Sequence, residues 1–144
     1  MFTSILVAVD ASDAAQAALR HACDLAKAGS AKVTLLNVID VSKLLAVAGY
    51  ETPYPVDAIE IMRKDGAQIL SDACAICGDY GITATTLTDE GDAVEEILST
   101  AEKTHADLIV LGTHGRKGLS RLFIGSVAEG VLRRADVPVL VVRQ

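Results

Sequence analysis

The sequence predicts an α/β fold: one domain over residues 1–144, built on a doubly wound, five-stranded parallel sheet of Rossmann-like type. Short apolar runs alternate with helical patterns five times along the 144 residues. Strands that are buried on both faces are nearly continuous apolar runs, and parallel neighbours need a crossover between them. Right-handed crossovers place helices on both faces of such a sheet.

The first elements are a strand, a helix and a second strand. Residues 4–10 form an apolar run that ends in aspartate. Ser12 can cap a helix over residues 13–28, and Gly29 is expected to end it. Residues 33–39 predict the second strand, since seven residues with mostly apolar side chains suit a buried position.

The middle of the chain begins with a long connection over residues 41–55, which carries apolar side chains and two prolines. Such a loop suggests a lid or a contact surface, or a segment that only packs over the sheet edge. Apolar residues at helical spacing predict a helix over residues 56–80, ended by Gly81. The threonine-rich residues 82–88 predict an edge strand, because one face is polar.

The last third contains two more helices and two more strands. Gly91 and Asp92 open the third helix, and residues 107–111 form a short apolar strand. Ser126 is expected to be the N-cap of a helix over residues 126–134, with Glu129 completing a capping box. The run from Val137 to Val142 predicts the final strand.

Composition argues against several classes of function. The net charge of −6 disfavours nucleic acid as a partner, since phosphate backbones require an extended basic surface. No apolar run reaches the ~18 residues of a membrane span, and the first residues lack the features of a signal peptide. We therefore expect a soluble cytoplasmic protein with neither a nucleic-acid nor a membrane partner.

The three cysteines do not predict a disulfide framework, because their number is odd and no secretory signal is visible. Cys74 and Cys77 have the spacing of a redox or metal pair. They lie within a helical pattern, and no second Cys or His pair would complete a zinc site. We favour a core position for Cys77 on the apolar face of that helix.

The stretch between the strand at 107–111 and the following helix carries most of the candidate site. Glycine lets a backbone approach a ligand closely, and the N–H groups at a helix N-terminus favour anions. Four glycines and three cations lie here: Gly112, Gly115, Gly118, Gly125, Arg116, Lys117 and Arg121. The combination predicts a cradle for phosphate groups.

The spacing Gly112-x2-Gly115-x9-Gly125-Ser126 resembles the ATP-binding pattern of the universal stress protein family, Gly-x2-Gly-x9-Gly-Ser/Thr. The strand ending in Asp10, the Gly-Asp pair before the third helix and the closing Val-Pro-Val-Leu-Val-Val strand also fit this family. The resemblance covers essentially the whole chain. It implies the strand order 3-2-1-4-5 and ATP, alone or with Mg²⁺, as the ligand.

The resemblance implies a site between the ends of the first and fourth strands. Asp10 would bind ribose hydroxyls or a phosphate-bound Mg²⁺, or it would only help Ser12 to cap the first helix. Backbone at Val38 and Ile39 would meet the adenine edge. The residues expected to bind the nucleotide are Asp10, Val38, Ile39, Leu111, Gly112, Gly115, Arg116, Gly125, Ser126 and Val127, and Asp10 is the candidate metal ligand.

Other nucleotide chemistries fit less well. Asp40 has the position of the ribose-binding acid in NAD-binding folds, but Asp-Ala-Ser-Asp follows the first strand instead of Gly-x-Gly-x-x-Gly. No P-loop pattern is present. His114 has no visible partner that would make it a catalytic base, so no catalytic residue is expected.

The favoured function is therefore that of an ATP-binding regulatory protein of the stress response. The final strand is almost entirely apolar and is expected at a sheet edge, which favours a homodimer. Two alternatives stay open: a slow ATP hydrolase or phosphotransferase that uses the same pocket, and a protein-interaction module switched by nucleotide.

Overall fold

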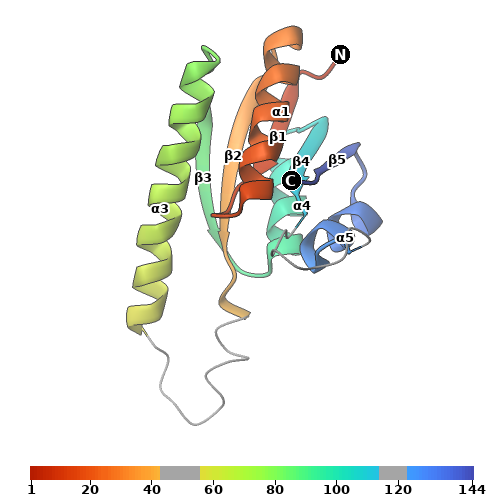
Figure 1. Cartoon of the computed structure of the whole chain (residues 1–144). Coiled ribbons are helices and arrows are strands. Elements are labelled where there is room, and N and C mark those ends of the chain that lie inside the picture. Colours follow the sequence, from red (N-terminus) through yellow and green to blue (C-terminus); the bar gives the residue numbers. More distant parts are fainter. Residues whose placement is uncertain (43–55, 114–122) are drawn as a thin grey trace.

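The computed structural model describes residues 1–42, 56–113 and 123–144 (Figure 1). Within them, no helix is long and apolar enough to cross a membrane. In chain order, the helices and strands are β1 (Ser4–Ala8), α1 (Asp13–Gly29), β2 (Lys32–Ile39), α3 (Val56–Asp79), β3 (Thr85–Glu90), α4 (Ala93–Lys103), β4 (Leu108–Gly112), α5 (Ser126–Arg134) and β5 (Val139–Val142).

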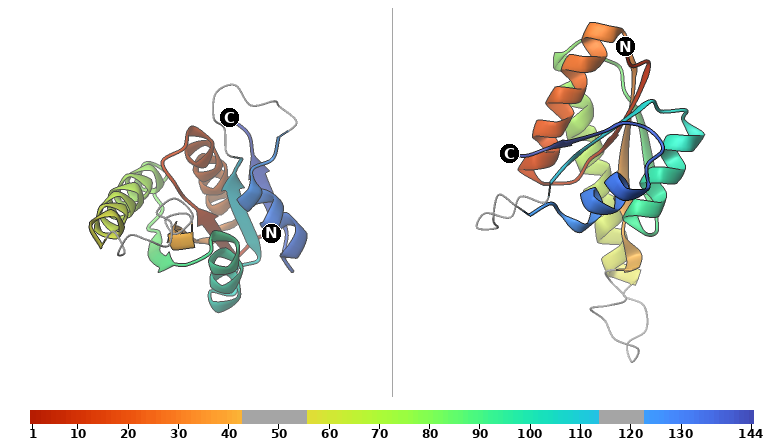
Figure 2. Two further views of the ribbon diagram at one scale, coloured as in Figure 1. Left: turned by 90° about the horizontal axis from the view of Figure 1, so that it is seen from below. Right: turned by 90° about the vertical axis from the view of Figure 1, so that its right-hand side faces the viewer.

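The five strands form one parallel sheet in the order β3-β2-β1-β4-β5, which confirms the predicted fold class and strand order. Helices α1 and α3 cover one face, and α4 and α5 cover the other (Figure 2). The first and fourth strands are parallel central neighbours, so their carboxyl ends lie at the same edge of the sheet.

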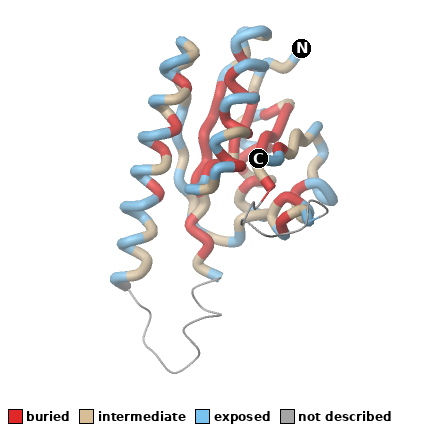
Figure 3. Tube along the Cα trace, viewed as in Figure 1, coloured by how far each residue is buried: buried red, intermediate tan, exposed pale blue. Residues whose placement is uncertain are grey.

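Two cores flank the sheet because successive side chains of a strand point to opposite faces. Ile5 and Val7 pack with α1 and α3, whereas Leu6 and Ile109 pack with α4 and α5. The central strands are buried along their length, and each helix is exposed on its outer side (Figure 3). The buried face of α1 is built largely from alanine, which lets its backbone lie close to the sheet.

Several predicted boundaries need correction. The edge strand β3 runs from Thr85 to Glu90 rather than over residues 82–88, because Ile82 still belongs to the connection after α3 and donates its N–H to Cys77. The last strand begins at Val139, since Pro138 has no N–H to add to the ladder. Helix α1 includes Gly29, and Ser30 ends it in the left-handed conformation.

The cysteine sulfurs meet between helices. Cys23 on α1 and Cys77 on α3 are buried free thiols, with their Sγ atoms 3.7 Å apart. Burial raises the pKa of the Cys77 thiol to about 12, and the neighbouring Cys23 adds to the shift. Throughout residues 1–42, 56–113 and 123–144, no group of three or more His, Cys, Asp or Glu residues could hold a metal ion. Both thiols therefore serve as small core side chains, as predicted for Cys77.

Asp107 ties the start of β4 to the start of β1. One carboxylate oxygen accepts from the N–H and the hydroxyl of Thr3 (2.8 and 2.9 Å), and the other accepts from the N–H of Ser4 (3.0 Å). These donors favour the charged carboxylate. The Ser4 N–H, followed by that of Thr3, lowers the pKa of Asp107 below its ordinary value of 3.8.

The end of β4 lies against α1 at Gly112. A Cβ atom there would lie 2.5 Å from the carbonyl carbon of Ala14 and 2.7 Å from the nitrogen of Ala15. Both are backbone atoms, so they cannot rotate away as a side chain would. The lack of a side chain at Gly112 is therefore a packing requirement of the fold, which the ligand-based reading of the sequence did not include.

We expect Asp107→Asn to lower the unfolding temperature near neutral pH. A carboxylate with a lowered folded pKa contributes stability above its unfolded pKa, and that contribution is lost as the pH falls through the folded value. The difference from wild type should therefore shrink below about pH 4. Thermal unfolding followed by circular dichroism across this range measures it, with the exposed Asp65→Asn as control. A difference that stays constant down to acid pH would contradict this role of the charge.

Gly112→Ala should destabilise the protein by about 1–3 kcal/mol, the usual cost of overpacking. Gly78 on α3 is the matched control, because a Cβ there meets nothing within 4 Å. Gly78→Ala should be neutral or stabilising by about 0.5–1 kcal/mol, since alanine is the better helix former. Urea unfolding of both variants gives the comparison. Equal stability of the two variants would show that α1 yields to the added methyl group.

Candidate functional site

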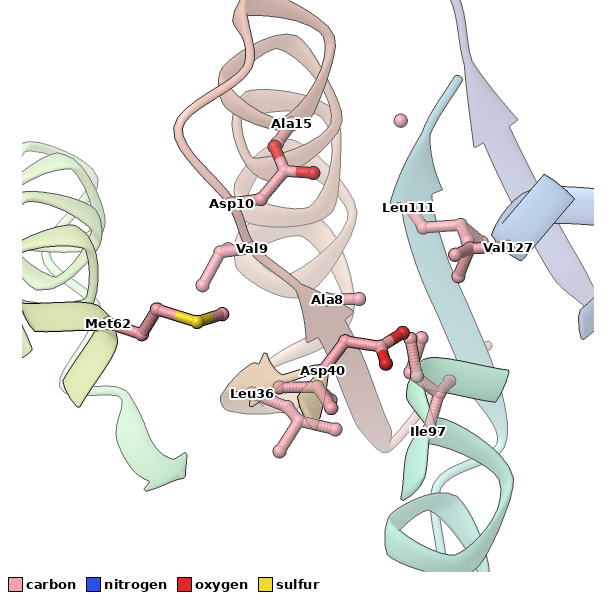
Figure 4. A pocket seen from close by; sticks show the side chains of 13 residues that line it. Ala8, Val9, Asp10, Ala15, Leu36, Asp40, Met62, Ile97, Leu111 and Val127 are labelled. Atoms are coloured by element: carbon pink, nitrogen blue, oxygen red, sulfur yellow. The ribbon is translucent and has the colours of Figure 1, made fainter. Parts of the chain in front are cut away.

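A cavity of about 440 Å³ lies at the carboxyl ends of the central strands (Figure 4). This is the position at which doubly wound sheets bind ligands, where the chain connections diverge to opposite faces. Its volume lies within the usual range of small-molecule sites. The residues that line it are Ala8, Val9, Asp10, Ala15, Leu36, Val38, Asp40, Met62, Ala93, Ile97, Leu111, Gly112 and Val127.

The lining is apolar except for two carboxylates, Asp10 and Asp40, which follow β1 and β2. Met62 reaches the cavity from α3 on one side, and Ile97 reaches it from α4 on the other (Figure 4). An apolar cavity with a few placed polar groups is typical of sites for organic ligands, because burial supplies affinity and the polar groups fix the orientation.

Asp10 organises the turn between β1 and α1. Its Oδ1 accepts from the N–H of Ser12 at 2.8 Å, and the Ser12 hydroxyl accepts from the N–H of Ala15 at 3.1 Å. Ser12 is therefore the N-cap of α1, as predicted, and Asp10 supports it. Because Asp10 also lines the cavity, the structural role and the predicted ligand role are compatible.

The exit of β1 is held by a buried amide. Asn37 of β2 is only 6% exposed, and its Nδ2 donates to the carbonyl of Val9 at 2.9 Å. Gly66 of α3 makes room for this side chain, since a Cβ at Gly66 would lie 2.5 Å from the Asn37 Oδ1. The floor of the cavity at Val9 is therefore fixed by a contact that involves β1, β2 and α3.

The end of β2 presents two of the predicted residues differently. Val38 lines the cavity, whereas Ile39 does not, and its side chain is buried at 1% exposure. The carbonyl of Ile39 accepts from the N–H of Gly91 at 3.0 Å. Val38 is thus the better placed of the two for a ligand.

The N-terminus of α5 opens near the cavity, since Val127 lines it together with Leu111 and Gly112. The predicted capping box is wrong. Gly125 is the N-cap, no side chain among the described residues caps the helix, and Ser126 is its first residue. The carboxylate of Glu129 bonds Arg133 instead of reaching back.

The absence of a side-chain cap has a consequence for ligands. The first N–H groups of an α-helix have no acceptor within the helix, and they carry the positive end of its dipole. In α5 these donors belong to Ser126 and the residues that follow it, next to the cavity wall at Val127. Gly115 and Arg116 of the predicted set, together with Lys117 and His114, lie outside the described residues, as does most of the loop at 41–55.

Eight lining residues were not predicted as ligand contacts: Ala8, Val9, Ala15, Leu36, Asp40, Met62, Ala93 and Ile97. Ala8 and Val9 adjoin Asp10 at the end of a predicted strand, so the position of the strand end was a usable signal. Met62 and Ile97 looked like ordinary core residues at helical spacing. Nothing in the sequence shows which core residue borders a cavity, because that depends on how the helices pack.

The comparisons agree with this geometry. The family profile described as "Universal stress protein family" matches residues 1–143. The universal stress protein MJ0531 of Methanocaldococcus jannaschii is 35% identical over 144 residues, which cover 100% of this chain and 84% of that protein. The solved structure of MJ0577, from the same organism, has a TM-score of 0.83 at 28% identity and covers 100% of this chain and 97% of its own.

Two further structural neighbours contain nucleotides. A universal stress protein in complex with cAMP has a TM-score of 0.68 at 25% identity, with 98% of this chain and 96% of its own covered. The universal stress protein from Archaeoglobus fulgidus in complex with dAMP has a TM-score of 0.66 at 26% identity, with 97% of each chain covered. On the profile match and the full-length relatives, this chain belongs to the universal stress protein family.

Proposed function

We propose that this protein is an ATP-binding regulatory protein of the stress response, which holds the nucleotide between the ends of β1 and β4. The observation that carries the proposal is the apolar cavity bordered by the N-terminus of α5, whose first N–H groups no described side chain caps. Such a terminus is a ready site for phosphate. Relatives of similar fold bind cAMP and dAMP, which supports an adenine nucleotide as the ligand class.

The strand order gives the nucleotide a direction in the cavity. Its phosphates would lie at α5 and Gly112, after β4, and the predicted cations Arg116 and Lys117 belong to the same connection. Asp10 follows the adjacent β1 and would meet the ribose, or Mg²⁺ bound to the phosphates. The base would then extend toward the end of β2.

We propose a binding role rather than rapid catalysis. Phosphoryl transfer requires a positioned nucleophile and charge stabilisation aimed at the transferring group. The described lining offers two carboxylates among apolar side chains. Two alternatives use the same cavity: a slow hydrolase or phosphotransferase, and an interaction module switched by nucleotide. Measurements of ligand affinity do not separate them from the proposed function. An assay of ATP turnover tests the first, and an assay of partner binding tests the second.

We also propose a two-fold homodimer through β5. The carbonyls of Pro138 and Val142 accept from the N–H groups of Ile109 on β4 and of Thr113 just after it, at 3.0 and 2.9 Å. Parallel pairing therefore turns the N–H and C=O groups of the alternate residues, among them Val141, to the opposite edge. In the described sheet β5 is terminal, so this row is available to an antiparallel β5 from a second copy.

We expect ATP to bind the wild-type protein and Ala93→Leu to weaken that binding by about tenfold or more, because the added side chain occupies the cavity. Ala93 is the first residue of α4 and lines the cavity while half-exposed, so the fold should tolerate the change. The exposed Ala28→Leu on α1 is the control. Calorimetric titration with ATP, ADP and AMP, with and without Mg²⁺, measures the affinities. Wild-type protein that binds none of these nucleotides would refute the proposed function.

Val141→Pro should convert the dimer to a monomer. Proline removes the N–H that faces the open edge, and edge positions of a sheet tolerate it. Val141→Thr keeps the N–H at nearly the same side-chain volume, so this variant should remain dimeric. Light scattering at micromolar concentration gives the mass of each protein. A monomeric wild type, or a Val141→Pro variant of dimeric mass, would contradict pairing through β5.

A further inference from the structure

We infer that Asp40 recognises the base of the bound nucleotide, by accepting a hydrogen bond from the exocyclic amino group of adenine. The inference rests on the proposed function, because it assigns a specificity residue to the same cavity. It concerns a residue that the sequence associated only with the ribose of NAD. Four observations lead to it: burial, hydrogen bonding, position in the sheet and the neighbouring side chains.

Among the residues that the structure describes, Asp40 is a buried carboxylate that accepts hydrogen bonds at one of its two oxygens. It is 9% exposed. Its Oδ1 accepts from the N–H of Ser42 at 3.1 Å and from the Ser42 hydroxyl. Its Oδ2 accepts from no described residue. In the described parts of the chain, every side-chain oxygen that is shielded from solvent has a hydrogen-bond partner. Oδ2 therefore keeps an accessible surface in a residue that lines the cavity.

A carboxylate in this setting requires a donor. An ionised carboxylate can only accept hydrogen bonds, and a buried acceptor without a partner is costly. Water in the cavity can donate to Oδ2, but a ligand that fills the apolar space displaces that water. A ligand that places an N–H or O–H group at Oδ2 is therefore favoured over one that places an acceptor or a C–H there.

The sheet order places Asp40 at the base end of the nucleotide. Strands β2, β1 and β4 are consecutive in the sheet, and neighbouring strands lie about 4.8 Å apart. Asp40, which follows β2, is thus about 10 Å across the sheet from the phosphate end at β4. Asp10 lies between them, after β1. Phosphate at α5 and ribose at Asp10 leave the base as the part of the ligand that reaches Asp40.

The surroundings of Asp40 suit a flat, apolar ring. Val38, Met62 and Ile97 line the same cavity as Asp40, and Figure 4 shows the Asp40 carboxylate turned toward Ile97, with Met62 on the opposite side. A methionine thioether packs favourably against an aromatic ring. Adenine offers an amino group at C6, whereas guanine has an oxygen acceptor at that position. Asp40 thus gives the cavity a means to prefer a 6-amino purine over a purine that has hydrogen at this position.

The test compares two ligands in the wild-type protein, in one variant and in a control variant. The ligands are ATP and purine riboside 5′-triphosphate, which differs from ATP only in having hydrogen in place of the 6-amino group. The variant is Asp40→Asn. Its amide oxygen must stay on the N–H of Ser42, because only an acceptor can bind there, so its NH₂ group faces the cavity. A donor then opposes the amino group of adenine.

Wild-type protein should bind ATP at least about tenfold more tightly than purine riboside triphosphate, as expected for a hydrogen bond to a charged group. Asp40→Asn should abolish this preference, because it should lower the affinity for ATP more than the affinity for purine riboside triphosphate. Asp10→Asn is the matched control: it should weaken both ligands equally, because they share the same ribose and phosphates. Isothermal titration measures all six affinities, and thermal unfolding verifies that each variant is folded.

Three results would overturn the inference. Equal binding of the two ligands by the wild type would show that the amino group is not recognised, and this result does not depend on the variant folding. A preference that persists in Asp40→Asn would assign recognition to another group. GTP binding more tightly than ATP would assign the cavity to a different base. Wild-type protein that binds no nucleotide would instead refute the proposed function itself, and this inference with it.

Discussion

Helix α1 lies so close to the end of β4 that one methyl group at Gly112 would overlap the backbone of Ala14. The alanine-rich face of α1 makes this approach possible, because small side chains bring a helix backbone near a sheet. The rest of the site depends on it. Ala15 of α1 and Gly112 of β4 border the same cavity, so the distance between these elements sets one of its walls. The close packing of α1 against β4 therefore determines both the core at this point and the shape of the cavity.

The polar groups of the cavity also have structural roles. Asp10 and Asp40 each follow a strand, and each accepts the N–H of the serine two residues further on. This turn lets a buried strand end without an unsatisfied N–H. It also leaves a carboxylate at the carboxyl edge of the sheet, where ligands of this fold class bind. Asn37 completes the arrangement by holding the carbonyl of Val9.

The contacts at the ends of β1 and β2 agree with membership of the universal stress protein family. The related structures with cAMP and dAMP show that nucleotides with one phosphate bind to proteins of this fold. In the present chain, the described groups that we propose as phosphate donors are backbone N–H groups at the start of α5. Backbone donors do not depend on side-chain charge, which is consistent with a phosphate site in a protein of net charge −6.

Apolar periodicity, helix caps and glycines determined the fold class, because buried strands, alternating crossovers and chain reversals are local in sequence. Ser12 as a cap and Gly112 as a site residue were visible for this reason. The capping box predicted at Ser126 was wrong, because a capping pattern does not fix which residue is the N-cap. In the structure, Gly125 is the N-cap and Ser126 is the first residue of the helix. Only the tertiary structure decided that Met62 and Ile97 border a cavity, that Gly112 is needed by α1, and that Asp40 lines the cavity with an oxygen that accepts from no described residue. Each of these depends on contacts between distant segments, whose distances a one-dimensional pattern does not contain.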